Sequence, residues 1–196
     1  AHKKIFDYRF EEEQAPEHLP CIAVVDIGHM RTDITVMNHG DLAFSRTVRR
    51  GGASILRSIG GPDADPRATE RLVAAHGRVL SDEEAGADVE AQALSNALSR
   101  GLYPILRDIN QTLRSHERIS RDPVDRIFLA GGMAHLPGLA PFMARVLEIP
   151  TELISELPPA LRTPVVATQD LCAMSKSIGL ALELIRGGSL QAINFR

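Results

Sequence analysis

The sequence predicts an α/β fold with a mixed five-stranded sheet, flanking helices and a helical insertion. Three observations carry this prediction. An apolar run at residues 21–26 ends in Asp and precedes Ile-Gly, two stretches of alternating apolar and polar residues follow it, and a second apolar run at residues 126–130 comes after a long helical section. Continuous short apolar runs are typical of strands buried on both faces, whereas alternation is typical of strands with one buried face.

The first three strands are predicted to form an antiparallel meander. They lie at residues 21–26, 32–37 and 42–48, and the last two are separated by the turn-forming sequence Asn-His-Gly-Asp. Strands joined by such short connections pair antiparallel. The unbroken apolar character of the first strand places it centrally in the sheet.

Two short helices are predicted after the meander. The first covers residues 53–59, between the Gly51-Gly52 pair and Gly60-Gly61-Pro62. The second begins at Asp65-Pro66, because Asp is a good N-cap residue and Pro fits the first helical position. His76-Gly77 ends it.

A long amphipathic helix is predicted from about Asp88. Its apolar stripe includes Leu94, Leu98, Leu102, Ile105, Ile109 and Leu113. Pro104 lies inside this stripe and predicts a kink or a break near Tyr103, because proline removes a helical hydrogen bond.

The C-terminal third should add two strands and two helices. The elements expected here are the strand at 126–130, a helix from about 136 to 147, a short edge strand at 150–154 and a last helix at 170–185. For the domain organisation, we expect a linker or fragment edge at 1–20, one lobe at 21–186 with a helical insertion at about 62–120, and a tail at 187–196. The chain starts with Ala rather than Met, which suggests a piece of a longer protein.

The composition excludes several classes of protein. The formal net charge of -3 and the hydrophobic fraction of 44% are those of an ordinary globular protein, so nucleic acid is not an expected partner. No segment is long and apolar enough for direct membrane insertion. Cys21 and Cys172 are expected to be reduced core residues of a cytoplasmic protein. The histidines show no metal-site spacing.

The loop after the first strand is the first candidate for ligand binding. Asp26 ends the strand, Gly28 permits a tight turn, and Thr32 begins the next strand. Backbone N–H groups of such a loop can bind a phosphate, and Asp26 is available to hold a hydrated metal ion. An ordinary hairpin connection is the alternative interpretation.

Two further glycine pairs follow a strand. Gly51 and Gly52 separate the meander from the first helix, and Gly131, Gly132 and Met133 follow the second apolar strand. Gly131 and Gly132 permit the close approach of a planar ligand such as a nucleobase. Each pair is also compatible with a simple strand-to-helix connection.

In series, these motifs resemble the second half of the actin and sugar-kinase superfamily, a ribonuclease H-like lobe. The closer likeness is to the bacterial PilM and FtsA group of actin-like proteins, which includes GspL-like proteins. The residues that carry it are Val25-Asp26-Ile27-Gly28 with Thr32, Gly40 to Arg46, Gly51-Gly52, and Phe128 to Gly132 with Leu136-Pro137-Gly138-Leu139. The final residues 191–196 are similar to a segment of GspL-like and PilM-like proteins.

The resemblance implies a nucleotide site, for which this chain supplies one side. Asp26, Gly28 and Thr32 would contact phosphate and hydrated Mg²⁺, Gly51 and Gly52 would lie beside them, and Gly131, Gly132 and Met133 would line the adenosine pocket. The family's earlier phosphate loop belongs to a first half that residues 1–20 cannot supply. ATP and Mg²⁺ are therefore cofactors to test in the full-length protein, and none is expected in this fragment.

The resemblance also implies a function. We expect a cytoplasmic actin-like scaffold of a type II secretion or type IV pilus assembly machine, located at the periphery of the inner membrane. Its expected partners are inner-membrane and cytoplasmic components of that machine, and a homo-oligomer is a further possible assembly. No catalytic residue is identified in this half. Leu56 stands where the PilM group commonly has Thr, and Val73 where it often has Lys. The alternatives are an ATPase or phosphotransferase, and a cell-division membrane tether with an amphipathic helix after Arg196.

Overall fold

The computed structural model describes residues 20–38, 41–81, 83–84, 86, 88–154 and 171–173. Its centre is a five-stranded sheet in the order β3-β2-β1-β4-β5. The strands are β1 (Ile22–Ile27), β2 (Thr32–Asn38), β3 (Asp41–Val48), β4 (Arg126–Ala130) and β5 (Thr151–Leu153). The predicted linker and tail, and nearly all of the predicted last helix, lie outside the described residues.

The sheet is mixed, as the sequence predicts. β1 pairs antiparallel with β2, β2 pairs antiparallel with β3, and β1 and β5 each pair parallel with β4. All six residues of β1 are buried, because strands flank it on both sides and side chains cover both faces. The three-strand meander and the central position of β1 are therefore confirmed.

The helices are α2 (Gly52–Gly60), α3 (Pro66–His76), α4 (Val89–Ser120), the short 3₁₀ helix η1 (Gly132–His135) and α5 (Leu139–Leu147). Asp65 caps α3 as predicted, since its carboxylate accepts a hydrogen bond from the Arg67 N–H at 3.0 Å. The helix predicted from residue 136 begins three residues later, because the chain first forms η1.

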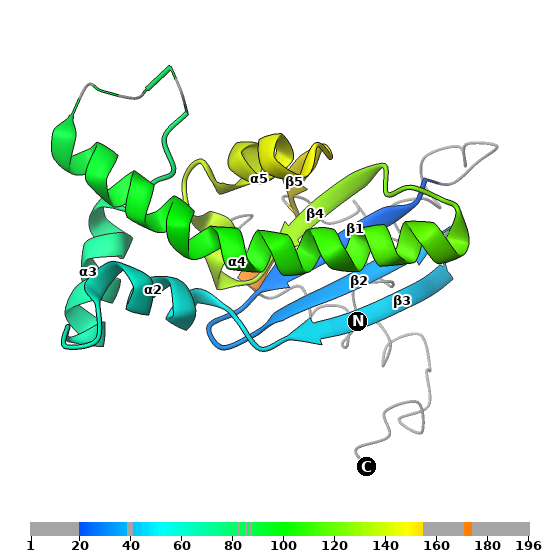
Figure 1. Cartoon of the computed structure of the whole chain (residues 1–196), viewed down its shortest axis with the longest axis horizontal. Coiled ribbons are helices and arrows are strands. Elements are labelled where there is room, and N and C mark those ends of the chain that lie inside the picture. Colours follow the sequence, from blue (N-terminus) through cyan, green and yellow to red (C-terminus); the bar gives the residue numbers. More distant parts are fainter. Residues whose placement is uncertain are drawn as a thin grey trace, which may run out of the picture.

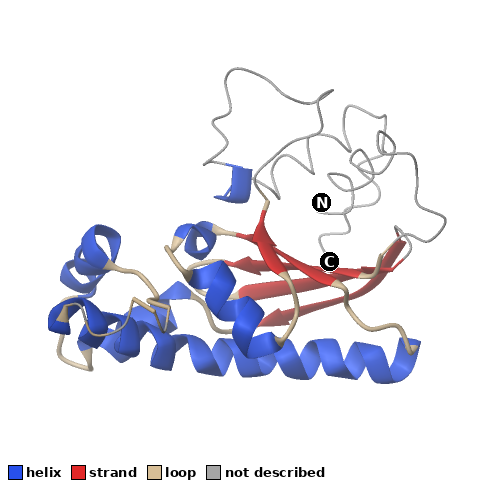
Figure 2. Ribbon diagram, turned by 90° about the horizontal axis from the view of Figure 1, so that it is seen from above, coloured by secondary structure: helices blue, strands red, loops and turns tan. Residues whose placement is uncertain are grey.

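α4 runs along the sheet and covers one of its faces (Figure 1; Figure 2). Its apolar stripe is buried in the main core with β1, β2 and β4. Beyond the end of the strands, its N-terminal half lies beside α2 and α3 (Figure 1). The connection between β3 and β4 therefore crosses the face of the sheet and also builds a helical layer at its end.

The helix continues through Pro104, so the break considered from the sequence does not occur. Pro104 leaves the carbonyl oxygen of Arg100 without its helical donor. Arg100 is exposed, whereas Leu102 and Ile105 are completely or almost completely buried. Water can bind the carbonyl on the outer side while apolar packing holds the inner side, which allows the helix to persist.

Both cysteines are buried free thiols, as the sequence predicts. Burial, with a smaller contribution from the nearby Asp125 and Asp122, raises the pKa of Cys21 to about 11. Burial also raises the pKa of Cys172. Because the thiolate is the reactive form, neither side chain is suited to nucleophilic chemistry at neutral pH.

Candidate functional site

The loop between β1 and β2 forms a tight turn that is joined to the start of α2. Within the loop, the Gly28 N–H donates to the Arg31 carbonyl oxygen at 2.9 Å. The Gly52 N–H donates to the Gly28 carbonyl oxygen at 2.9 Å, and the Ala53 N–H donates to the His29 carbonyl oxygen at 2.8 Å. The first two predicted glycine loops are therefore in direct contact.

Gly51 is required for this contact. A Cβ atom at Gly51 would collide with the Gly28 carbonyl oxygen and lie 2.8 Å from both the Arg31 nitrogen and the His29 oxygen. These neighbours are backbone atoms, which cannot rotate away as a side chain can. The absence of a side chain at Gly51 thus lets the start of α2 lie against the first loop.

Thr32 strengthens the same junction from inside. Its side chain is completely buried, and its hydroxyl donates to the Arg50 carbonyl oxygen at 2.8 Å. In this position the hydroxyl ties the start of β2 to the residue before Gly51.

Replacing Thr32 by Val should therefore weaken this junction. Val has nearly the shape of Thr but leaves the Arg50 carbonyl without this donor, which costs about 1 kcal/mol. Urea unfolding followed by circular dichroism measures the change. Thr47→Val is a suitable control, since the Thr47 hydroxyl bonds the Asp33 carboxylate in an exposed position, and an equal loss in both variants would contradict the assigned role.

The third loop lies on the other side of β1, against Asp26. Asp26 is 6% exposed and pairs in register with Ala130 at the end of β4. Gly131 has a positive φ of 86°, and a Cβ atom there would lie 2.5 Å from both Asp26 Oδ1 and the Ile27 carbonyl oxygen. The Gly131 N–H donates to the Cys172 carbonyl oxygen at 2.8 Å. Asp26 is thus enclosed between the first and third loops.

All three loops border one cavity of about 600 Å³. Gly28 and His29 come from the first loop, Gly52 and Leu56 from α2, and the far wall from α3 and the segment that starts with η1. The remaining lining residues are Glu70, Val73, Ala74, Ala75, Gly77, Gly132, Met133, His135, Leu136 and Pro137. The volume lies within the range of small-molecule sites.

The predicted site residues divide into two groups around this cavity. Gly28, Gly52, Gly132 and Met133 line it. Asp26, Thr32, Gly51 and Gly131 are buried behind the lining and hold the loops together. Leu56 and Val73, the two departures from the family pattern, both line the cavity and make that wall more apolar.

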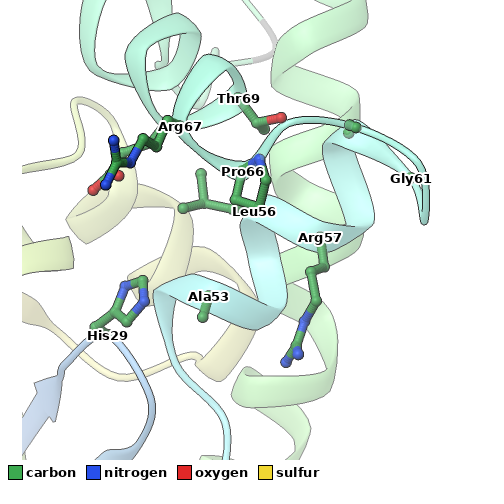
Figure 3. A pocket seen from close by; sticks show the side chains of 11 residues that line it. His29, Ala53, Leu56, Arg57, Gly61, Pro66, Arg67 and Thr69 are labelled. Carbon is green, nitrogen blue, oxygen red and sulfur yellow. The ribbon is translucent and has the colours of Figure 1, made fainter.

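A smaller cavity of about 280 Å³ adjoins the first one between α2 and α3 (Figure 3). Leu56 stands between the two helices, and His29, Leu56 and Glu70 belong to both cavities. Arg57 and Arg67 are among the residues that line the smaller cavity. Among the described residues, no group of acidic, histidine or cysteine side chains is arranged to hold a metal ion.

The sequence interpretation missed part of the wall that α3 and the following Gly77 contribute. It identified Val73 but not Ala74, Ala75 or Gly77, which also line the larger cavity. The small residues before His76 were the available signal, because a run of Ala and Gly on a helix leaves space for a ligand. His135, Leu136 and Pro137 were likewise not assigned to the site.

Comparison with protein families identifies the chain. Residues 8–185 match the family described as type IV pilus assembly protein PilM. The chain belongs to the PilM family. No curated protein sequence matches it at a significant level.

Solved structures confirm the actin-like fold of this PilM family member. A PilM-PilN type IV pilus biogenesis complex aligns with a TM-score of 0.68 at 18% identity, over 96% of this chain and 51% of the other. MreB5 of Spiroplasma citri bound to AMPPNP gives 0.57 at 15% identity, over 94% of this chain and 60% of the other. The archaeal actin homologue Ta0583 gives 0.60 at 13% identity, over 94% and 54%.

The chain thus spans about half the length of the solved structures that it matches. At such low sequence identity, these structures establish the fold alone. Among the described residues, no helix has the length and apolarity needed to cross a bilayer.

Proposed function

We propose that this chain is the second lobe of an actin-like scaffold in type IV pilus assembly, acting on the cytoplasmic face of the inner membrane. The convergence of its three glycine loops on one cavity of about 600 Å³ supports a retained adenine-nucleotide site. Membership of the PilM family supports the assignment to the pilus machine. The type II secretion machine is the second candidate system.

The larger cavity suits the adenosine part of a nucleotide. Val73, Ala74 and Leu136 offer apolar surface for a base, and Glu70 offers a carboxylate that can accept hydrogen bonds from ribose hydroxyls. A Cβ atom at Gly132 would meet no atom within 4 Å, so the space beside this glycine is open. These residues therefore fit adenosine, and the phosphates would extend toward the Gly28 loop.

A binding role is better supported than hydrolysis. Asp26 is 6% exposed and enclosed by Gly131, so in this conformation it is not presented to a ligand in the cavity. Leu56 and Val73 supply no polar group. We propose that Mg²⁺, when bound with nucleotide, lies near Asp26 through water, and that the first lobe completes the phosphate side.

In this proposal, nucleotide binding changes the affinity for partner proteins. A ligand that binds between two lobes binds the closed state more tightly than the open state. Binding therefore shifts the equilibrium toward the closed state, and the size of the shift is set by the difference between the two affinities. A partner that prefers one arrangement is then bound more tightly or more weakly, by the same coupling factor in both directions. The partners expected are inner-membrane and cytoplasmic components of the pilus machine.

Calorimetry of the full-length protein with ATP and Mg²⁺ tests the nucleotide site. Gly132→Val should reduce the affinity at least tenfold, because the branched side chain would occupy open space at the cavity wall. Asp26→Ala is less informative, since it also changes a buried contact with the third loop.

Thermal unfolding of Gly132→Val provides the necessary control. The variant should unfold within a few degrees of the unmodified protein, because no atom lies near the new Cβ. Absence of ATP binding by the unmodified protein would refute the nucleotide site and leave the scaffold role. Steady phosphate release would instead favour the ATPase alternative.

A further inference from the structure

The outer face of α4 carries a row of arginines. Arg100, Arg107, Arg114 and Arg118 are all exposed. At 3.6 residues per turn, they lie within about 40° of one line along the helix and extend over about 27 Å. We call these four residues the arginine row. The opposite side of the helix is the apolar stripe packed in the core, so the arginine row lies on the side of the helix that faces away from the sheet.

The charge of this row is not neutralised within the described part of the chain. None of its four arginines forms an ion pair with a described carboxylate. The Arg114 side chain donates to the Asn110 side-chain oxygen at 2.8 Å, which leaves its positive charge uncompensated. Exposed helices usually mix both signs on one face, so a row of a single sign needs an explanation.

Acidic residues of α4 lie beside the row and not on it. Asp108 lies about 80° around the helix from Arg100 at 100° per residue, and its carboxylate is 3.6 Å from the Arg50 guanidinium. Glu117 lies on the opposite flank. The positive potential is thus concentrated along the outermost line of the helix, although the whole chain has a formal net charge of -3.

We propose that the arginine row adsorbs to an anionic lipid surface. Each arginine near such a surface contributes about a fivefold increase in binding, and four in a row act on one plane. The row lies on a single rigid helix supported by the sheet, so its charges can approach a flat surface together. Adsorption of this kind requires no insertion of the helix.

The surroundings of the row favour a lipid surface over a protein partner. Stable protein interfaces are centred on buried apolar anchors. Between Arg100 and Arg118, the only large apolar side chain that is exposed among the described residues is Tyr103, at 51%; Ile119, at 86%, lies just beyond the row and about 100° around the helix from Arg118. The Tyr103 ring stacks edge-on against Phe142 with centroids 5.7 Å apart. A tyrosine beside basic residues is well suited to the lipid headgroup region.

Vesicle co-sedimentation with the full-length protein tests this proposal. Binding to vesicles that contain phosphatidylglycerol should exceed binding to pure phosphatidylcholine vesicles and should fall as salt is added. The triple variant Arg100→Gln, Arg107→Gln, Arg114→Gln should bind the anionic vesicles about a hundredfold more weakly. Its circular dichroism melting curve should match that of the unmodified protein.

A matched control separates the row from net charge. Arg57→Gln, Arg67→Gln, Arg71→Gln removes three exposed arginines from α2 and α3 and should retain vesicle binding within a factor of about three. Equal losses in the two triple variants, or no binding by the unmodified protein at low salt, would overturn the proposal. Duplex DNA binding through the row without vesicle binding would also overturn it, in favour of nucleic acid.

This inference goes beyond the proposed function, and its test is independent of it. Nucleotide binding in the cavity is measured without vesicles, and the substituted arginines of the row do not line that cavity. Loss of vesicle binding with intact ATP binding would therefore concern the arginine row alone.

Discussion

Gly131→Ala is expected to destabilise the protein by about 3–5 kcal/mol. Alanine is strained at the positive φ of 86° that Gly131 adopts, and its Cβ atom would lie 2.5 Å from Asp26 Oδ1 and from the Ile27 carbonyl oxygen. The Ile27 oxygen belongs to the central strand, which cannot move without disturbing the sheet. In a chain of this size, such a loss lowers the melting temperature by roughly 10 °C.

Gly132→Ala is the matched control for this substitution. Gly132 has no positive φ, and a Cβ atom there would meet nothing within 4 Å. The free energy of unfolding of the Gly132→Ala variant should therefore remain within about 1 kcal/mol of that of the unmodified protein. Urea unfolding of both variants measures the difference. Equal stability of the two would show that the third loop does not enclose Asp26 as described.

Ile109→Ala should lower the free energy of unfolding by about 3–4 kcal/mol, nearly as much as Gly131→Ala. Ile109 is completely buried and lies in the middle of the apolar stripe of α4. Removing its side chain loses the free energy of burying the apolar atoms. It also leaves a cavity between the helix and the sheet, which the surrounding structure can fill only in part. Urea unfolding should show a lower midpoint with an unchanged slope.

Gln111→Ala provides the comparison on the same helix. Gln111 is exposed, and alanine has the highest helix propensity, so the unfolding free energy should change by less than about 0.5 kcal/mol. A small loss in Ile109→Ala would mean that α4 contributes little to the core. The N-terminal half of α4 would then be held mainly by its neighbours α2 and α3.

The sequence correctly predicts the secondary-structure elements that are determined by a few neighbouring residues. β1 follows from an unbroken apolar run, and α3 begins where Asp65 and Pro66 satisfy the first turn. Of the kink or break predicted near Tyr103, the break does not occur, because the apolar packing of α4 outweighs one lost hydrogen bond on the exposed side. The late start of α5 was missed, because the tight turn at Gly131 first produces η1.

The candidate site could be predicted only as a set of loops. Glycine positions indicate where the chain can approach a ligand, but not which glycines border the space. Thr32 faces Arg50, 18 residues away in sequence, and this contact depends on how β3 returns along β2. The wall formed by α3 depends in the same way on the path of the chain after α2, which no local signal specifies.

The bonds between the Gly28 loop and the start of α2 have a mechanical consequence. Three backbone or side-chain hydrogen bonds, from Gly52, Ala53 and Thr32, join residues 28–32 to residues 50–53. These two segments should therefore shift as one rigid body. A change in the width of the cavity would then come from movement of its far wall, which includes α3, while the floor formed by the two loops stays intact.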